Sequence, residues 1–217
     1  MLIDLSHTIV EGMTTYPGLA GPVLKDVLSR DVSAERFGGI RMHIGKVCMV
    51  ANTGTYLDVP FHYYEDLAEL ASFPIEGFVD LPGVYVDATK APSRAITPDY
   101  FTIDVSGKAV LVHTGWDRHF GTEQYGVDAP YLPSETVDAL LSRGAALVGI
   151  DSVNIDSIDD PTRPAHCGFL AAGTLIVEHL VGLGQLADQP SFSFTAVPPK
   201  FAALGTFPVR AFARCPE

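Results

Sequence analysis

ANTGTYLDVPFHYYED, Ala51–Asp66, is a dense run of polar side chains inside a mostly apolar chain. Asp58 and His62 lie four residues apart in this run, on either side of Pro60. Because a proline cannot donate a backbone hydrogen bond, Pro60 argues against a regular central strand at this point. The preceding residues Arg41–Val50 roughly alternate apolar and polar side chains and predict a strand. The run is therefore interpreted as a loop at a strand end, where functional groups are usually placed.

Composition limits the class of protein. The chain has 217 residues, of which 47% are hydrophobic and 18% charged, which favours a packed globule over a disordered segment. One domain over residues 1–217 is expected, since domains commonly take about 100–200 residues. Fourteen basic and twenty-six acidic residues give a formal charge of −12, so neither nucleic acid nor an anionic membrane is expected as a partner. Three cysteines without CxxC spacing indicate neither a disulfide framework nor a thiolate zinc site.

The location expected from the sequence is cytoplasmic. The first residues, MLIDLSHTIVEGM, lack the basic and apolar regions of a secretion signal. No apolar stretch reaches the length of about 18 residues that a membrane span needs. A cytoplasmic location follows by default.

Short apolar runs of strand length recur along the chain, each bounded by Gly, Pro or Asp. They predict strands at Val84–Val86, Ala109–Val112, Ala146–Ile150, Thr174–Val177, Phe192–Val197 and Val209–Ala213.

Helices are fewer than strands. PSETVDALLSRG predicts a helix with Ser134 as its N-cap, apolar residues on one face and Gly144 as its stop. Shorter helical turns are predicted at Thr97–Phe101 and His166–Ala172. Because strand, helix and strand alternate across residues 98–150, the predicted class is α/β, a mixed sheet with flanking helices and additional antiparallel hairpins.

A second group of polar residues follows a predicted strand about a hundred residues after the first. GIDSVNID (Gly149–Asp156) leaves that strand, and RPAHCGFLAAGTLIVEHL (Arg163–Leu180) supplies His166 and Glu178. Together with the Asp and His of the first run, these side chains form an oxygen and nitrogen ligand set suited to zinc, manganese or ferrous iron.

Structural roles compete with this interpretation. A single Asp after a Gly-Thr turn is commonly a turn acceptor, and a lone His beside aromatic residues is commonly a packed side chain. Glu178 is harder to explain in this way, because a carboxylate between Val177 and Leu180 must face solvent, a partner or a cation. Asp151 and Asp156 are assigned to turns. The remaining histidines have no ligand spacing and are assigned no function: His7, His43, His113, His119 and His179.

The first run also resembles a known family motif. The cyclase-type metal-dependent hydrolase family, which includes bacterial kynurenine formamidase and isatin hydrolase, has the hallmark His-x-Gly-Thr-His-x-Asp-x-Pro-x-His. The same positions here run from Asn52 to His62 and keep its Gly, Thr, Asp, Pro and last His. Further similarity lies in DLSHTIVEGMTTYPG, in HTGW, in GIDSVNID, in the spacing of His166 and Glu178, and in FPVRAFA.

The resemblance implies a swivelling β/β/α fold, usually oligomeric, whose metal site activates water against an amide, lactam or ester carbonyl. Carried over by position, Asp58 resembles the carboxylate that binds or bridges metal, and His166 and Glu178 resemble ligands of the second metal position. His62 resembles the last histidine of the motif, a general acid and base.

Two motif histidines are missing, because Asn52 and Tyr56 stand in their places. An amide oxygen and a neutral phenol of pKa about 10 are weaker ligands than imidazole, so the first metal position is expected to be lost or weakened. One divalent metal per chain is expected, with zinc first and manganese second. Its predicted ligands are Asp58, His166 and Glu178, since three protein ligands plus water form a complete catalytic zinc site.

Three functions remain open from the sequence. The leading hypothesis is an arylformamidase-like hydrolase in which the metal lowers the pKa of water, His62 relays the proton, and Tyr56 and Asn52 donate hydrogen bonds toward the carbonyl. The second is a metal-independent cyclase, dehydratase or isomerase that uses these side chains as acid and base. The third is a small-molecule-binding relative without catalysis.

The expected partners are a small-molecule substrate and further copies of the chain, as a homodimer or homotetramer. Low charge and high apolar content favour such self-association. An aromatic substrate is suggested by aromatic residues that could line a pocket, namely Phe61, Tyr63, Tyr64 and Trp116.

Overall fold

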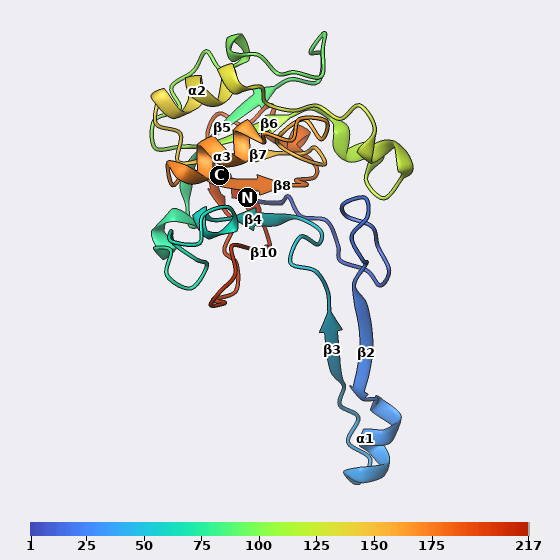
Figure 1. Cartoon of the computed structure of the whole chain (residues 1–217). Coiled ribbons are helices and arrows are strands. Elements are labelled where there is room, and N and C mark those ends of the chain that lie inside the picture. The colour runs from blue at the N-terminus through green and yellow to red at the C-terminus, as the bar shows by residue number, and fades with distance from the viewer. Residues whose placement is uncertain (217) are drawn as a thin grey trace.

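Four parallel strands form the middle of a nine-stranded sheet. In order, these strands are β5 (Leu81–Asp87), β6 (Ala109–His113), β7 (Leu147–Ile150) and β8 (Leu175–Glu178). The computed structural model describes residues 1–216, and Figure 1 shows these strands at the centre of the main body. Each strand overlaps a predicted apolar run.

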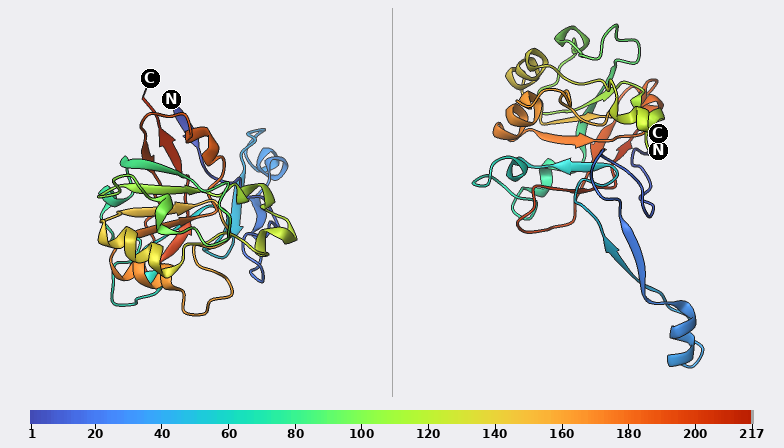
Figure 2. Two further views of the ribbon diagram at one scale, coloured as in Figure 1. Left: turned by 90° about the horizontal axis from the view of Figure 1, so that it is seen from above. Right: turned by 45° about the vertical axis from the view of Figure 1, so that its right-hand side comes forward.

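Antiparallel strands extend this sheet at both sides. Beyond β8 lie β4 (Tyr56–Asp58) and then β10 (Thr206–Pro208), and beyond β5 lie β9 (Ser193–Thr195), β11 (Phe212–Arg214) and β1 (Leu2–Asp4). The sheet is curled along its length, as the two further views show (Figure 2). The predicted α/β class with a mixed sheet is confirmed.

Because successive side chains point to opposite faces of the sheet, the hydrophobic core around the sheet is divided into two clusters. On β6, Ala109 and Leu111 pack into one hydrophobic cluster, whereas Val110 and Val112 pack into the other, on the opposite face. All four side chains are fully buried, so this strand is apolar on both faces, as parallel strands covered on both sides are.

Two helices cover one face of the sheet (Figure 1). Helix α2 spans Ser134–Ser142 and helix α3 spans Pro164–Ala171. The helix predicted in PSETVDALLSRG is confirmed, but Pro133 and not Ser134 is its N-cap, and Ser134 is the first helical residue. Six short 3-10 helices complete the described elements: Pro60–His62, Ile75–Gly77, Pro98–Tyr100, Trp116–His119, Glu123–Gly126 and Leu183–Leu186.

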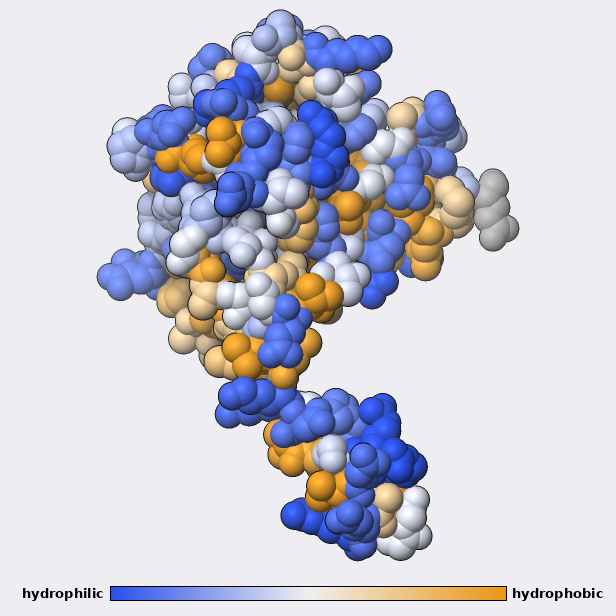
Figure 3. Space-filling view, turned by 90° about the vertical axis from the view of Figure 1, so that its right-hand side faces the viewer, coloured by the Kyte–Doolittle hydropathy of each residue, from blue (hydrophilic) through white to orange (hydrophobic). Residues whose placement is uncertain are grey.

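An arm projects from the body and is made of β2 (Val23–Leu28), α1 (Arg30–Arg36) and β3 (Ile44–Cys48) (Figures 1 and 2). The two strands pair only with each other, and Ser29 caps α1 by accepting a hydrogen bond from the Val32 amide. Orange apolar residues are visible along the arm in Figure 3. Those with exposed side chains are Val23, Leu24, Val27, Val32, Phe37, Ile40, Met42, Ile44 and Val47.

The expectation of a loop around Pro60 is wrong for the residues just before it. Tyr56–Asp58 form β4, which is paired on both sides, and Pro60 comes only after the strand has ended, at the start of a 3-10 turn. Strands β1, β2 and β10 and helix α1 were not predicted either. None of the helices within residues 1–216 has the length and apolar composition needed to cross a bilayer.

Candidate metal centre

The pairing of β4 with β8 brings three polar side chains to one face of the sheet. Tyr56 lies opposite Glu178 in the antiparallel register, and Asp58 lies two residues further along β4. Since successive side chains alternate between faces, Leu57 and Val177 enter the hydrophobic cluster on the other side. The polar face is the one on which α3 packs, and α3 carries His166.

Asp58 is fully buried, and neither of its carboxylate oxygens has a hydrogen-bond partner among residues 1–216. Its Oδ2 lies 3.7 Å from Nε2 of His166, and its Oδ1 lies 4.0 Å from Nε2 of His62. A buried carboxylate without hydrogen bonds is costly, so Asp58 requires a cation or a protonated neighbour at this position.

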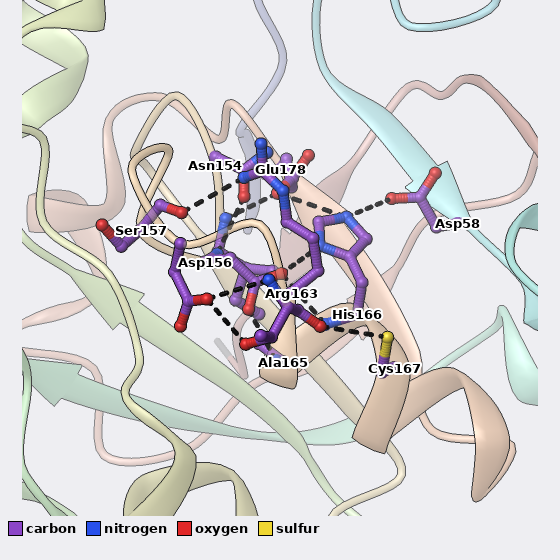
Figure 4. A network of polar contacts seen from close by, with 12 residues as sticks. Asp58, Asn154, Asp156, Ser157, Arg163, Ala165, His166, Cys167 and Glu178 are labelled. Atoms are coloured by element: carbon purple, nitrogen blue, oxygen red, sulfur yellow. Dashed lines mark hydrogen bonds and ion pairs between the residues drawn. The ribbon is translucent and has the colours of Figure 1, made fainter.

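His166 is oriented by a second carboxylate. Its Nδ1 donates to Oδ2 of Asp156 at 2.6 Å, and Asp156 also accepts from the backbone amides of Ala165 and His166. Figure 4 shows the ring held between Asp156 and Asp58. Nε2 is thereby directed toward Asp58 and Glu178, and a carboxylate partner on the other nitrogen is the usual support of a metal-binding histidine.

Negative charge around His166 dominates its protonation. Burial lowers the pKa of His166, but Glu178 and the two neighbouring aspartates outweigh this effect and raise the pKa to about 10. The surroundings of His166 therefore favour a positive charge near Nε2, which a proton or a metal cation could supply.

Glu178 is equally buried but has protein donors for both oxygens. Oε1 accepts from the backbone amide of Ile155 and Oε2 accepts from the hydroxyl of Tyr56, both at 2.6 Å. Oε1 also lies 3.8 Å from Nε2 of His166. Burial raises the pKa of Glu178 to about 7, against the opposing effect of His166.

Tyr56 is a neutral hydrogen-bond donor here. Burial, followed by the nearby charges of Glu178 and Asp58, raises its pKa well above 10. Its proton is directed to Glu178, and its oxygen lies 3.3 Å from Nε2 of His179.

A cavity of about 250 Å³ lies over this group. His62, on the 3-10 turn after β4, is the most exposed of the four predicted site residues with an ionisable Asp, Glu or His side chain, with 29% of its side chain accessible. Of the four aromatic residues predicted to line a pocket, only Tyr63 does so here. The lining residues are Tyr16, Leu19, Asn52, Tyr56, His62, Tyr63, Asn154, Arg163, His166 and Glu178.

Two glycines permit the close packing around β4. Gly54 has φ of +67°, a left-handed conformation that allows the turn into the strand. Gly205 passes directly against the 3-10 turn, where an added Cβ would lie 2.1 Å from the backbone nitrogen of His62. A side chain at Gly205 would therefore displace His62.

The structure brings the predicted site residues together from positions far apart in the sequence. Asp58, His62 and His166 offer ligand atoms that all lie within 4.8 Å of one another, a group that could hold a metal ion. Glu178 adjoins this group through His166, and Asn52 and Tyr56 line the cavity above it.

Three residues at the site were assigned to turns or to no function by sequence reasoning, or were not considered. Asp156 orients His166, His179 contacts Tyr56, and Arg163 lines the cavity in a left-handed conformation with φ of 50°. Arg163 directly precedes the helix that carries His166, Asp156 lies eight residues before that helix begins, and His179 directly follows Glu178. Their nearness in sequence to His166 and Glu178 could have pointed to these three residues, but it does not predict where their side chains point.

Comparisons with known proteins point to one family. A family model described as "Putative cyclase" matches residues 3–157. A curated kynurenine formamidase of Bacillus cytotoxicus is 27% identical over 213 residues, covering 98% of this chain and 96% of the relative.

Solved structures show the same fold at lower identity. An isatin hydrolase bound to the product analogue thioisatinate superposes with a TM-score of 0.86 at 18% identity, covering all of this chain and 92% of the other. Isatin hydrolase A from Labrenzia aggregata, bound to benzyl benzoate, gives a TM-score of 0.85 at 22% identity, covering all of this chain and 94% of the other.

Proposed function

The chain belongs to the cyclase family, and from that premise we propose that it is a metal-dependent hydrolase of a small amide, lactam or ester. The observation that carries the proposal is Asp58, whose two buried oxygens have no hydrogen-bond partner and lie beside two imidazoles. The similarity to a kynurenine formamidase and to isatin hydrolases supports a carbon–nitrogen bond as the target.

Nε2 of His166 lies close enough to each carboxylate to share a divalent cation with it, although Glu178 is outside the group of Asp58, His62 and His166 whose ligand atoms all lie within 4.8 Å of one another. Two ligands that each lie about 2.1 Å from one metal can be no more than ~4.2 Å apart. Nε2 of His166 lies 3.7 Å from Asp58 and 3.8 Å from Glu178, which is within that limit. Asp58, His166 and Glu178 would hold the metal, because each Glu178 oxygen has accepted only one hydrogen bond and keeps a further lone pair.

When bound, a divalent metal supplies Lewis-acid chemistry, which lowers the pKa of water and polarises a carbonyl oxygen. We assign the transfer of the water proton to Nε2 of His62, which is accessible from the cavity and 4.0 Å from Asp58. Asn52 has an amide group on the cavity wall and would donate a hydrogen bond to the substrate carbonyl. The Tyr56 proton is already directed to Glu178, so Tyr56 acts through that carboxylate.

The cavity wall suggests what the substrate carries. Tyr16 and Tyr63 provide flat apolar surfaces suited to an aromatic ring. Arg163 is the only Lys or Arg among the lining residues, and its guanidinium makes one side-chain hydrogen bond, to the Ser157 carbonyl. An aryl amide with a polar or anionic substituent is the substrate class that these groups would accept.

The test combines metal analysis with turnover. Protein purified without chelator is expected to contain about one metal per chain, and to hydrolyse an N-formyl aniline or a small lactam only while the metal is present. Asp58→Asn serves as the matched inactive control. Turnover that survives complete metal removal would support a metal-independent cyclase, dehydratase or isomerase, and tight ligand binding without turnover would support a binding protein.

We also propose that the chain forms a homodimer or homotetramer through the arm. Its apolar side chains are exposed on a hairpin whose two strands pair only with each other among residues 1–216, with Val27 and Ile40 at least 60% accessible. Such a patch usually marks an interaction site. Sedimentation equilibrium at micromolar concentration should show an oligomer that Val27→Asp weakens, and a wild-type monomer would contradict the proposal.

A further inference from the structure

A row of buried hydrogen-bonding groups lies behind Glu178. The Tyr56 hydroxyl lies 2.6 Å from Oε2 of Glu178 and 3.3 Å from Nε2 of His179. Nδ1 of His179 in turn lies 2.9 Å from the hydroxyl of Tyr125. All four residues are at least 97% buried.

With Glu178 ionised, one arrangement of protons makes every contact in the row a hydrogen bond. A carboxylate can only accept, so Tyr56 must donate its single proton to Oε2. The Tyr56 oxygen can then only accept, so its 3.3 Å contact with His179 is a hydrogen bond when the proton of a neutral His179 is on Nε2. In that arrangement Nδ1 carries no proton and accepts from Tyr125.

The backbone conformation of His179 brings its ring to Tyr56 and Tyr125. In a continued strand the residue after Glu178 would face the other side of the sheet. His179 instead has φ of 56°, a left-handed conformation that is unfavourable for a residue with a side chain. Its carbonyl accepts from the Thr55 hydroxyl at 2.6 Å, and its ring lies edge-on to Phe120. The first contact ties down the backbone of His179, and the second packs against its ring.

We propose that His179 and Tyr125 are positioning residues that fix the direction of the Tyr56 proton and thereby the orientation of Glu178. Oε2 is held by Tyr56, which leaves Oε1 as the oxygen facing His166 Nε2 at 3.8 Å. The inference rests on the proposed function, because it assigns Glu178 to the metal site. Hydrogen-bond partners of ligands typically change metal affinity by about 10–100-fold.

The test uses variants that change one hydrogen bond at a time. Tyr125→Phe removes only the donor to Nδ1. His179→Gln keeps the direction of the row, because its side-chain oxygen can accept from Tyr125 and its amide can donate to Tyr56. His179→Leu breaks the row. Tyr85→Phe is the matched control, since Tyr85 makes a similar 2.7 Å bond to His113 away from the cavity.

The first measurement is the tautomer of His179 in metal-free protein, by ¹⁵N NMR of the histidine ring, assigned through the signal lost in His179→Gln. We expect the Nε2-protonated form in the wild type and a loss of this preference in Tyr125→Phe. An Nδ1-protonated ring in the wild type would overturn the proposal.

The second measurement is the affinity for Zn²⁺ in a competition titration. We expect a loss of about 10-fold in Tyr125→Phe and up to about 100-fold in His179→Leu, with affinity largely restored in His179→Gln. Equal affinities in Tyr125→Phe and Tyr85→Phe would overturn the proposal even if His179→Leu failed to fold. Neither measurement uses catalysis, so failure to find a hydrolysed substrate would count against the proposed function alone.

Discussion

Asp58 and Glu178 are two buried carboxylates on neighbouring strands, and they differ in how the protein treats them. Both Glu178 oxygens accept hydrogen bonds, and the Tyr56 donor is backed by two further buried residues. Asp58 receives no hydrogen bond on either oxygen. Part of the hydrogen-bonding capacity of each Glu178 oxygen is therefore used within the protein, whereas none of the capacity of the Asp58 oxygens is used among residues 1–216.

The difference shows that burial alone does not identify a metal ligand. A carboxylate whose hydrogen bonds are satisfied can be part of the protein core, so the assignment of Glu178 depends on its distance to His166. A carboxylate without partners keeps its place at a cost in stability, which is expected where an external cation supplies the missing interaction. Asp58 is therefore the more direct indication of a metal.

The largest effect is expected from Asp58→Asn. The substitution keeps the size of the side chain but removes the charge that has no partner in the protein, so metal binding and turnover should be lost together. Equilibrium dialysis followed by metal analysis measures the first, and hydrolysis of an N-formyl aniline the second. Asp66→Asn, outside the cavity lining, is the control. Full metal content in Asp58→Asn would remove the distinction between the two carboxylates.

His62→Ala should be the next largest change. If His62 moves the proton, kcat should fall by roughly 10²–10⁴-fold while metal content stays near that of the wild type. Loss of metal in this variant would show that His62 is a ligand, as its place within the 4.8 Å group allows. Unchanged turnover would exclude both roles. His43→Ala, on the exposed arm, is the matched control.

Tyr56→Phe tests Glu178, the carboxylate whose oxygens accept hydrogen bonds. It removes one of the two donors to Glu178 and leaves the ring in place, so kcat should fall by about 10–100-fold, as for loss of a hydrogen-bond partner of a metal ligand. Metal affinity should fall less, because Ile155 still holds Oε1. A variant with wild-type turnover would mean that Glu178 needs no support from Tyr56.

Asn52→His combined with Tyr56→His should produce a smaller gain. Both positions line the cavity beside Asp58, and imidazole is a stronger ligand for zinc than an amide or a neutral phenol. Metal stoichiometry should rise above that of the wild type, without a rise in turnover, because the Tyr56 donor to Glu178 is lost. Metal analysis after dialysis measures the stoichiometry. Two metals bound to the wild type would show that these positions were misread.

Much of the fold was predictable from the sequence because its central strands are short, apolar on both faces and bounded by turn residues. β6 and β8 follow this pattern directly. β4 was not predicted, because Pro60 was taken as evidence against a strand that in fact ends two residues before it. The arm strands were partly missed because their apolar side chains face no core within the chain.

The site was predictable in its residue types but not in its contacts. Asp58, His166 and Glu178 could be named from the motif resemblance, and strand alternation explains afterwards why they share a face. The hydrogen bonds of Asp156 and His179 could not be foreseen, since they depend on a helix start and on a left-handed turn. Neither feature has a specific sequence signature at these residues.

The smallest expected effect is a change of stability with pH in the metal-free protein, where His166 lies between the two carboxylates. Its pKa is raised from 6.5 to about 10 in the folded state, so folding favours the protonated ring. A raised pKa contributes stability that is fully present below pH 6.5 and is lost as the pH rises through about 10. The melting temperature of chelator-treated protein should therefore fall across this range, and His166→Asn should lack that slope. Zinc should abolish the slope in the wild type as well, because a ligand nitrogen carries no proton. A wild-type slope equal to that of His166→Asn would show that the two carboxylates do not act on His166 together.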